Sequence, residues 1–305
     1  MDSLRVEDIV KACGGKFLCG NLGDVVLGFS KDTRSIKPGE VFVGIKGENF
    51  DGNAYYMNAF ENGACACIIE RSFEENVDIG AVDGKSIIVV EDGIKALQDI
   101  AKFRRNMYNI PVVAITGSVG KTSTKDIVAS GLSKSFNVLK TEGNNNNHIG
   151  LPLTILRLKD QNAMVVEMGM NHLGEISVLT NIARPSVCVI TNIGTSHIGN
   201  LGSRENILKA KLEILEGLQD GGTVIVNNDN DLLHSWAIQN KDKCNIVTYG
   251  IENDSDYMAY NIENTEENVS YDIDIARKTY KVNVPVSGIP FVYNSLSAIA
   301  VRSDL

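Results

Sequence analysis

Long apolar runs are absent from the sequence. No window of 18 or more residues is apolar, and the N-terminal stretch MDSLRVEDIV has no basic segment followed by an apolar one. We therefore expect neither a membrane span nor a signal peptide. Positive charge is also scarce, with 29 Lys and Arg against 38 Asp and Glu and a net charge of −9. Nucleic-acid binding needs clustered basic residues, so we expect no such partner, whereas an anionic substrate needs only a local group of donors.

The cysteines lack the spacing of a metal or redox motif. The six cysteines, at positions 13, 19, 65, 67, 188 and 244, include no C-x-x-C pair. Their pattern favours buried reduced thiols over metal ligands. Such thiols are typical of the reducing cytosol, so we predict a cytoplasmic protein.

One glycine is missing from the stretch AITGSVGKTST, which otherwise resembles a phosphate-binding loop. The common P-loop pattern, G-x-x-x-x-G-K-[ST], requires a glycine five residues before Gly120, where this chain has Ile115. The nearest earlier glycine is Gly117, which produces the shorter pattern G-x-x-G-K-T. The stretch is either an unusual nucleotide site or a glycine turn with a chance lysine.

The context of this stretch favours a nucleotide site. It follows an apolar strand pattern and opens a helical one, so free backbone N–H groups and the helix dipole would point at one spot. Lys121 would add a positive charge there, and Thr122 a hydroxyl able to bind Mg²⁺.

The order of apolar patterns predicts an α/β protein with two domains, residues 1–108 and 109–305. In the first, we expect helices at 6–12, 54–62 and 93–108 and strands at 41–45, 66–70 and 86–90. In the second, we expect strands at 111–116, 164–168, 187–193, 223–228 and 245–250, helices at 121–135, 174–182 and 204–218, and a β excursion at 257–284. Continuous Val/Ile-rich strands between helices indicate a parallel sheet covered on both faces. A helical pattern that starts at 295 runs into the last residue, so we expect the natural protein to continue beyond it.

Two polar residues follow strands of the second predicted sheet. Glu167 ends the apolar run AMVVE, and His197 comes after the next predicted strand. In an open parallel sheet, ligands collect at the carboxyl ends of the strands. A surface or helix-capping Glu and a structural His are the alternatives, but the shared location favours a metal site.

Lys211 lies on the apolar stripe of the predicted helix 204–218, together with Ile207, Ala210, Ile214 and Leu215. One interpretation is a lysine that extends from the edge of the stripe to solvent. The other is a desolvated lysine with a lowered pKa, whose neutral amine can take up CO₂ as a metal-binding carbamate.

These stretches together resemble the Mur ligase family. The resemblance rests on GSVGKTST, GNNNNHIGLP, VVEMGMNHLGEI, TNIGTSHIGNLGS and AKLEIL in this order, and on SKDTRSIKPGEVFVGIKGENFDGN in the first domain. It covers essentially the whole chain. It implies a small mixed α/β N-terminal domain that binds a UDP-sugar and a central doubly wound, mostly parallel ATPase domain of the P-loop type. The family's third, C-terminal domain is absent from this chain.

The resemblance also implies roles for individual residues. ATP would be bound by Gly117, Ser118, Gly120, Lys121, Thr122, Ser123 and Asn294, the last at the adenine. Mg²⁺, in two copies, would be held by Thr122, Glu167, His197 and a carbamylated Lys211, and the catalytic residues would be Lys121, Lys211, His197 and Glu167. The UDP-sugar substrate would contact Thr33, Arg34, Lys46, Gly47, Asn53, Asn146, Asn147, Asn171 and His172. His148 and Asn53 depart from the family pattern, in which an acidic residue and a histidine are common.

The implied reaction is ATP-dependent amide-bond formation in peptidoglycan precursor synthesis. MGMNHLGEI and GNNNNHIGLP favour the member that joins D-alanyl-D-alanine to UDP-MurNAc-tripeptide through an acyl phosphate, with release of ADP and phosphate. The alternatives are a sibling ligase that adds another amino acid and a module that binds both nucleotides without turnover. A plain P-loop kinase explains neither Lys211 nor the first domain. We expect a monomer.

Overall fold

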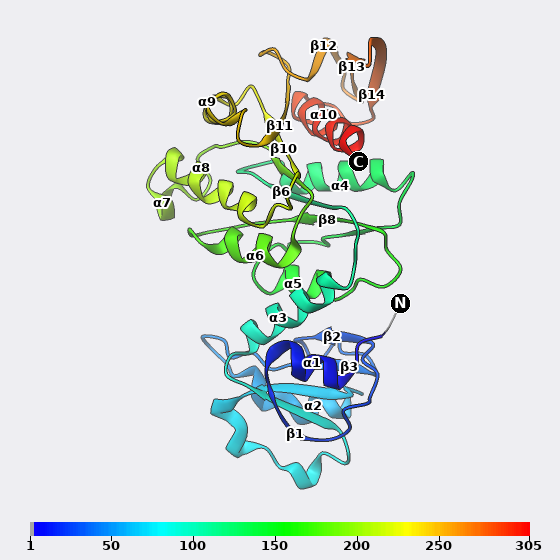
Figure 1. The fold of residues 1–305 in the computed structure, drawn as a ribbon, viewed down its shortest axis with the longest axis vertical. Helices are drawn as coiled ribbons and strands as arrows, with labels where there is room; N and C mark the ends of the chain where they lie inside the picture. Colours follow the sequence, from blue (N-terminus) through cyan, green and yellow to red (C-terminus); the bar gives the residue numbers. More distant parts are fainter. Residues whose placement is uncertain (1–2) are drawn as a thin grey trace. The chain divides into compact units, whose positions relative to one another are not determined.

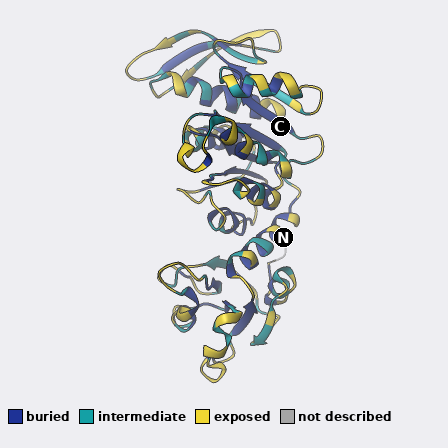
Figure 2. Cartoon of the chain, turned by 90° about the vertical axis from the view of Figure 1, so that its left-hand side faces the viewer, coloured by how far each residue is buried: buried dark blue, intermediate teal, exposed yellow. Residues whose placement is uncertain are grey.

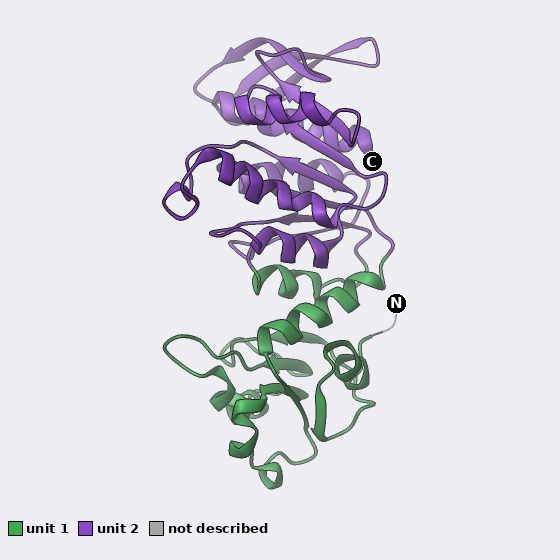
Figure 3. Ribbon diagram, turned by 60° about the vertical axis from the view of Figure 1, so that its left-hand side comes forward, with its two compact units in different colours: residues 1–108, 148–160 green, residues 109–147, 161–305 purple. Residues whose placement is uncertain are grey.

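The chain forms two compact units in the computed structural model, which describes residues 3–305. Unit 1 comprises Met1–Tyr108 and His148–Asp160, and unit 2 comprises Asn109–Asn147 and Gln161–Leu305 (Figure 3). Residues 148–160 thus belong to unit 1 although they follow the first strands of unit 2 in sequence. They are tied to unit 1 by hydrogen bonds from Gln98 to the His148 carbonyl and from Arg104 to the Leu158 carbonyl.

Unit 1 contains one five-stranded sheet in the order β1-β5-β4-β3-β2, in which β2 to β5 are parallel and β1 is antiparallel. Its strands are β1 (Lys16–Cys19), β2 (Gly28–Ser30), β3 (Glu40–Val43), β4 (Ala66–Glu70) and β5 (Ser86–Val90). Its helices are α1 (Val6–Cys13), α2 (Tyr56–Glu61), α3 (Gly93–Asn106) and α5 (Gly150–Ile155), with 3₁₀ turns at Gly52–Tyr55, Arg71–Asn76 and Ile79–Ala81. The sheet packs through a core that includes Phe42, Ile69 and Ile87.

Unit 2 contains a nine-stranded sheet in the order β14-β13-β12-β11-β10-β9-β6-β8-β7. Its strands are β6 (Val112–Thr116), β7 (Val138–Lys140), β8 (Ala163–Glu167), β9 (Val187–Ile190), β10 (Thr223–Asn227), β11 (Asn245–Gly250), β12 (Tyr257–Asn264), β13 (Val269–Ile275) and β14 (Lys278–Val284). The strands from β7 to β12 run parallel, and β13 and β14 complete an antiparallel meander. The chain leaves β6 for the edge strand β7, returns to β8 and then crosses to β9 on the other side of β6. Such a reversal places a binding crevice at the carboxyl ends of the strands around β6.

Helices cover the nine-stranded sheet (Figure 1). They are α4 (Lys121–Leu132), α6 (Glu175–Ala183), α7 (Ile198–Leu201), α8 (Arg204–Leu212), α9 (Asp231–Asn240) and α10 (Ile289–Asp304), with a 3₁₀ turn at Glu213–Gly217. α4 and α10 pack on each other and on a core that includes Ile115, Val189 and Leu296. The strands β6, β8, β9 and β10 are buried along their whole length, whereas the outer sides of the helices are exposed (Figure 2).

The structure confirms the predicted α/β class with mostly parallel sheets. The sequence patterns missed several short or weakly periodic elements, namely β1, β2, β7, α5, α7 and α9. The predicted helix 204–218 is α-helical only to Leu212 and continues as the 3₁₀ turn. No helix among residues 3–305 is both long and apolar enough to cross a membrane. All six cysteines are free; Cys67 and Cys188 are buried and the other four half-buried.

Candidate active site at the carboxyl ends of β6, β8 and β9

The predicted phosphate loop joins β6 to α4, and β6 is an interior strand of the sheet in unit 2, between β9 and β8. Gly117 has a φ of 151° and Gly120 a φ of 82°, which are backbone conformations that favour glycine. Gly120 is the N-cap of α4, and the first bond into the helix is donated by Thr124 N to Gly120 O at 2.9 Å. The earlier N–H groups of α4 therefore have no helical acceptor, and they point outward from the positive end of the helix. This arrangement suits an anion.

Two side chains of the first turn of α4 lie at this loop. The Lys121 ammonium donates to the carbonyl of Gly117 at 2.9 Å and to that of Ser118 at 3.4 Å. Burial lowers the pKa of Lys121, and the nearby Glu167 carboxylate opposes that shift. The Thr122 hydroxyl donates to Glu167 Oε2 at 2.9 Å. The loop and the end of β8 thus form one site.

Glu167 is the last residue of β8 and is 2% exposed. Its second carboxylate oxygen accepts a hydrogen bond from Asn146 Nδ2 at 2.7 Å. Its backbone N–H donates to the Thr141 hydroxyl at 3.0 Å. A buried carboxylate needs such partners, and here both of its oxygens have one. The surface-Glu interpretation is therefore wrong.

His197 lies beyond the end of β9 in a left-handed conformation, with a φ of 66°. Partial burial lowers the pKa of its imidazole, and the positive charges of Lys211 and Lys121 lower it further. β9, which precedes His197, pairs in parallel with β6, which precedes the phosphate loop. The structure thus brings His197 to the same end of the sheet as the phosphate loop.

Lys211 lies near the end of α8 and is only 1% exposed. The interpretation as a lysine that reaches solvent is therefore wrong. Among residues 3–305, no carboxylate forms an ion pair with its ammonium. Burial, and then the charge of Lys121, lower the pKa of Lys211 to about 7. A substantial fraction of this side chain is consequently neutral at physiological pH.

The other residues predicted to bind ATP occupy the rim of this site. Asn294, on α10, accepts a hydrogen bond from the Thr124 hydroxyl at 3.0 Å and is 9% exposed. The Ser118 hydroxyl accepts from Gly194 N at 2.9 Å. Ser123 lines a mostly apolar groove of about 800 Å³ between α4, α10 and β14. None of these contacts tests a role in ATP binding, which stays a prediction.

Sequence reasoning missed two residues that hold the phosphate loop, Thr191 and Asn192. The Thr191 hydroxyl donates to Val119 O at 2.7 Å, and Asn192 Oδ1 accepts from the backbone N–H groups of Ser118 and Val119. The available signal was the polar pair Thr-Asn near the end of the strand predicted at 187–193, at the same end of the sheet as the loop.

The residues predicted to hold UDP follow two neighbouring parallel strands of unit 1. Thr33 and Arg34 come after β2, and Lys46 and Gly47 come after β3. Arg34 is exposed and forms a bidentate pair with Asp32, at 2.9 and 2.6 Å, which lowers the pKa of that carboxyl to about 2.

Asn53 has a different environment from the other predicted substrate residues. It is fully buried, and its amide donates to Asp51 and accepts from Glu70 N. Its hydrogen-bonding capacity is directed at the protein, so in this conformation it makes no surface available for direct contact with substrate. The remaining predicted substrate residues lie in unit 2; Asn147, Asn171 and His172 are exposed, whereas Asn146 is bonded to Glu167.

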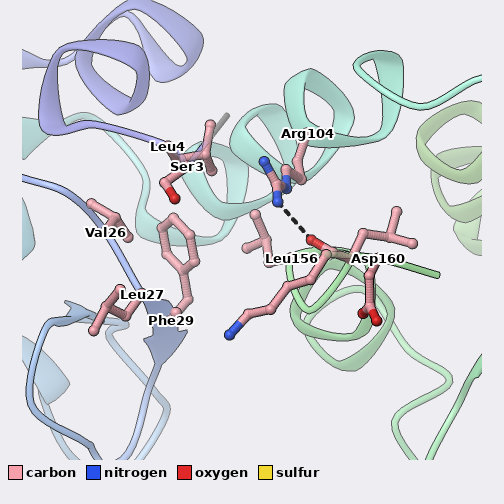
Figure 4. Close-up of a pocket in the computed structure, with 11 residues that line it drawn as sticks. Ser3, Leu4, Val26, Leu27, Phe29, Arg104, Leu156 and Asp160 are labelled. Carbon is pink, nitrogen blue, oxygen red and sulfur yellow. Dashed lines mark hydrogen bonds between the residues drawn. The ribbon is translucent and has the colours of Figure 1, made fainter. Parts of the chain in front are cut away.

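A separate cavity of about 430 Å³ lies in unit 1 beside the edge strand β2 (Figure 4). Phe29 and Leu156 contribute apolar walls, and Arg104 donates to the Leu158 carbonyl at 2.6 Å. None of the predicted substrate residues lines this cavity.

Comparison with known proteins identifies the family. The model of the Mur ligase middle domain matches residues 115–302, and that of the Mur ligase family catalytic domain matches residues 28–105. The chain therefore belongs to the Mur ligase family, as its motifs predict.

Its relatives in that family include ligases named UDP-N-acetylmuramoyl-tripeptide–D-alanyl-D-alanine ligase. That of Bacillus subtilis is 39% identical over 277 residues, which are 90% of this chain and 58% of the relative. That of Escherichia coli is 38% identical over 206 residues, 67% of this chain and 44% of the relative. The chain thus spans about half the length of these curated relatives.

Two solved structures show the same fold. A crystal structure of MurF from Acinetobacter baumannii matches with a TM-score of 0.89 at 29% identity. The match covers 99% of this chain and 65% of the MurF chain. A crystal structure of MurF ligase from Thermotoga maritima in complex with ADP matches with a TM-score of 0.80 at 29% identity. The match covers 91% of this chain and 62% of the Thermotoga maritima chain.

Proposed function

We propose that the chain is the UDP-sugar-binding and ATP-binding part of an ADP-forming ligase that joins D-alanyl-D-alanine to UDP-MurNAc-tripeptide. The observation that supports this best is the group formed by the phosphate loop, Glu167, His197 and Lys211 at one end of the sheet in unit 2. The names of the relatives support the choice of substrates.

The phosphates of ATP would lie against the start of α4. Its free N–H groups and the Lys121 ammonium are donors suited to a polyphosphate. The other predicted loop residues, Gly117, Ser118, Gly120 and Ser123, shape and flank this donor group, and Asn294 lies on the adjoining helix. The reaction requires a substrate carboxylate to approach the γ-phosphate, and donors at this point would reduce the repulsion between the two anions.

The residues around Glu167 fit Mg²⁺. Thr122 and Glu167 offer hard oxygen donors that already lie 2.9 Å apart, and His197 adds a ring nitrogen nearby. No group of three His, Cys, Asp or Glu side chains suited to a metal occurs within residues 3–305. The proposed ligands differ from such a group because they include a hydroxyl and a lysine. Bound Mg²⁺ would supply charge neutralisation at the triphosphate.

The charge of Lys211 decides whether two metal ions fit this site. A buried ammonium close to Lys121 would repel a second cation, whereas a carbamate at the same position would attract one. The neutral amine is the form that reacts with CO₂, and burial favours that form. We therefore propose that Lys211 is carbamylated in the working enzyme.

The proposed chemistry proceeds in two steps. The substrate carboxylate attacks the γ-phosphorus of ATP, which forms an acyl phosphate and releases ADP. The amine of D-alanyl-D-alanine then attacks the acyl carbon, and phosphate leaves. The UDP-sugar would be held by Thr33, Arg34, Lys46 and Gly47, and its muramoyl part by Asn146 and Asn147.

Equilibrium binding of Mg-ATP and of UDP-MurNAc-tripeptide to the chain tests this proposal, with phosphate release measured alongside. Binding of both with turnover in the presence of D-alanyl-D-alanine supports the ligase. Binding of both without phosphate release favours the module without turnover. Acceptance of a different amino acid favours a sibling ligase, and failure to bind either nucleotide contradicts the proposal.

The carbamate has its own test. After incubation with ¹³C-bicarbonate, the chain should show a carbamate ¹³C signal by NMR that Lys211→Ala lacks. In the full-length ligase, Lys211→Ala should abolish most ligation, with partial rescue by a short carboxylic acid. The same signal in both proteins, or near-normal activity without rescue, contradicts the assignment. A cytoplasmic location and a monomeric state remain predictions, and sedimentation of the purified chain tests the latter.

A further inference from the structure

Asn192, the second residue after β9, holds the phosphate loop at two successive peptide groups. Its side-chain Oδ1 accepts from Ser118 N at 3.1 Å and from Val119 N at 3.0 Å. Its backbone carbonyl also accepts from Ser118 N at 3.0 Å. Two N–H donors on one oxygen decide the orientation of the amide, because the nitrogen of the amide could not accept either bond.

Two neighbouring contacts hold the same half of the loop. The Thr191 hydroxyl donates to Val119 O at 2.7 Å, and Gly194 N donates to the Ser118 hydroxyl at 2.9 Å. Residues 191–194 therefore bind Ser118 and Val119 through both backbone and side chains. A contact made at so many points does not depend on one rotamer.

The second half of the loop has the opposite character. Among residues 3–305, no acceptor binds the N–H groups of Gly120, Lys121, Thr122 or Ser123, since the first helical bond is donated by Thr124. In phosphate-binding loops, successive backbone N–H groups usually turn together toward the anion. Here the N–H groups of Ser118 and Val119 point instead to Asn192. The N–H groups of residues 120 to 123 are available to an anion.

We propose that Asn192 is a positioning residue that fills the place of an anion at Ser118 and Val119 and confines phosphate binding to the N–H groups from Gly120 to Ser123. The inference rests on the proposed nucleotide binding. It explains how a loop without a glycine at Ile115 keeps a defined conformation: the side chain of a neighbouring strand end satisfies the donors that a longer loop would turn toward phosphate.

Amide hydrogen exchange of single residues tests the arrangement directly. In the chain without nucleotide, Ser118 and Val119 should exchange slowly and Gly120 and Lys121 rapidly. Mg-ADP should slow exchange from Gly120 to Ser123 and leave Ser118 and Val119 unchanged. Rapid exchange at 118 and 119 without nucleotide, or faster exchange there with Mg-ADP, overturns the proposal.

Variants of Asn192 provide the second readout. Asn192→Ala should remove the protection at Val119 and only weaken that at Ser118, whose N–H keeps the backbone carbonyl of residue 192 as an acceptor. It should weaken Mg-ADP binding by roughly 5- to 10-fold, the equivalent of about one neutral hydrogen bond. Asn192→Asp keeps an oxygen that can accept both bonds, so it should retain the protection. Asn240→Ala is the matched control, because it removes a half-buried asparagine whose side chain bonds only to the Trp236 carbonyl and the Lys243 ammonium, at the end of α9 and away from the phosphate loop.

The outcomes separate this proposal from the proposed function. If the wild-type chain and Asn192→Ala bind Mg-ADP with equal affinity, the proposed role of Asn192 is overturned. The proposed function is then unaffected. Absence of Mg-ADP binding by the wild-type chain contradicts the proposed function, while the exchange pattern without nucleotide still tests the contact. If Asn192→Ala fails to fold, the exchange pattern in the wild-type chain and in Asn192→Asp decides the matter.

Discussion

Gly117→Ala should damage the phosphate loop through one specific clash. A Cβ at Gly117 would lie 1.9 Å from Thr191 Oγ1, far inside any real contact, and 3.1 Å from Thr191 Cβ. The backbone conformation adds strain, because a φ of 151° is rare for residues other than glycine, at a cost of about 1–3 kcal/mol. Displacement of the Thr191 hydroxyl breaks its bond to Val119, worth about 1 kcal/mol. We expect the free energy of unfolding to fall by about 2–4 kcal/mol.

A double-mutant cycle separates the clash from the strain. Thr191→Ala removes the clashing oxygen, so in the Gly117→Ala background it should cost nothing further or restore stability. The two losses should therefore be non-additive by about 1 kcal/mol or more. Urea unfolding of the four proteins measures this, and Mg-ADP affinity should follow the same order. Gly131→Ala is the control, because its Cβ would meet nothing within 4 Å and alanine is favoured inside α4.

Two results would refute this reasoning. One is a Gly117→Ala chain that unfolds at the wild-type urea concentration. The other is strict additivity with Thr191→Ala, which would show that the clash contributes nothing to the loss.

Three further predictions follow from individual side chains. Tyr271, fully buried and bonded to Ser295, has a pKa raised to about 12 by burial, so the unfolded chain releases its proton first and stability should fall between pH 10 and 12. Urea unfolding at pH 10 and at pH 12 measures this. The free energy of unfolding should fall by about 2–3 kcal/mol less in Tyr271→Phe than in wild type. Glu167→Gln should reduce the gain in ADP affinity that Mg²⁺ produces by about tenfold or more, because ligand charge sets affinity for this cation. Titration of ADP with and without Mg²⁺ measures this gain, and an unchanged gain would exclude Glu167 as a ligand. Lys211→Met should raise the free energy of unfolding by about 1 kcal/mol or more, since it removes a buried ammonium that lacks an ion pair, and a lower melting temperature would contradict this.

Much of unit 2 could be predicted because its signals are local. The strand VVAIT, the two glycines and the helix start at Lys121 are consecutive in the chain, and the observed β6 and α4 begin within a residue of the predicted positions. The short edge strand β7 carries only three residues, too few for a clear pattern. The helix expected to reach residue 218 changes to a 3₁₀ turn after Leu212, where tertiary packing rather than periodicity decides the end.

Some features of the candidate site could likewise be predicted from the sequence, and others could not. Glu167 and His197 were predictable from their positions after apolar strands, and Lys211 from its place on an apolar stripe. Whether Lys211 reached solvent was not predictable, because a stripe does not show what covers its edge; the structure shows that the side chain is buried. The family resemblance likewise implied that Asn53 contacts substrate, whereas in the fold its amide bonds to Asp51 and to the Glu70 backbone N–H.

The sequence by itself determined the α/β class, the family and the order of strands and helices around a short phosphate loop, because periodicity and turn chemistry act between near neighbours. Only the tertiary structure decided how that loop is held. Ser118 and Asn192 are 74 residues apart, and they meet because β6 and β9 pair in register in the interior of the sheet. A hydrogen bond depends on the placement of two atoms to within a fraction of an ångström, and that placement comes from the packed sheet rather than from the residues on either side.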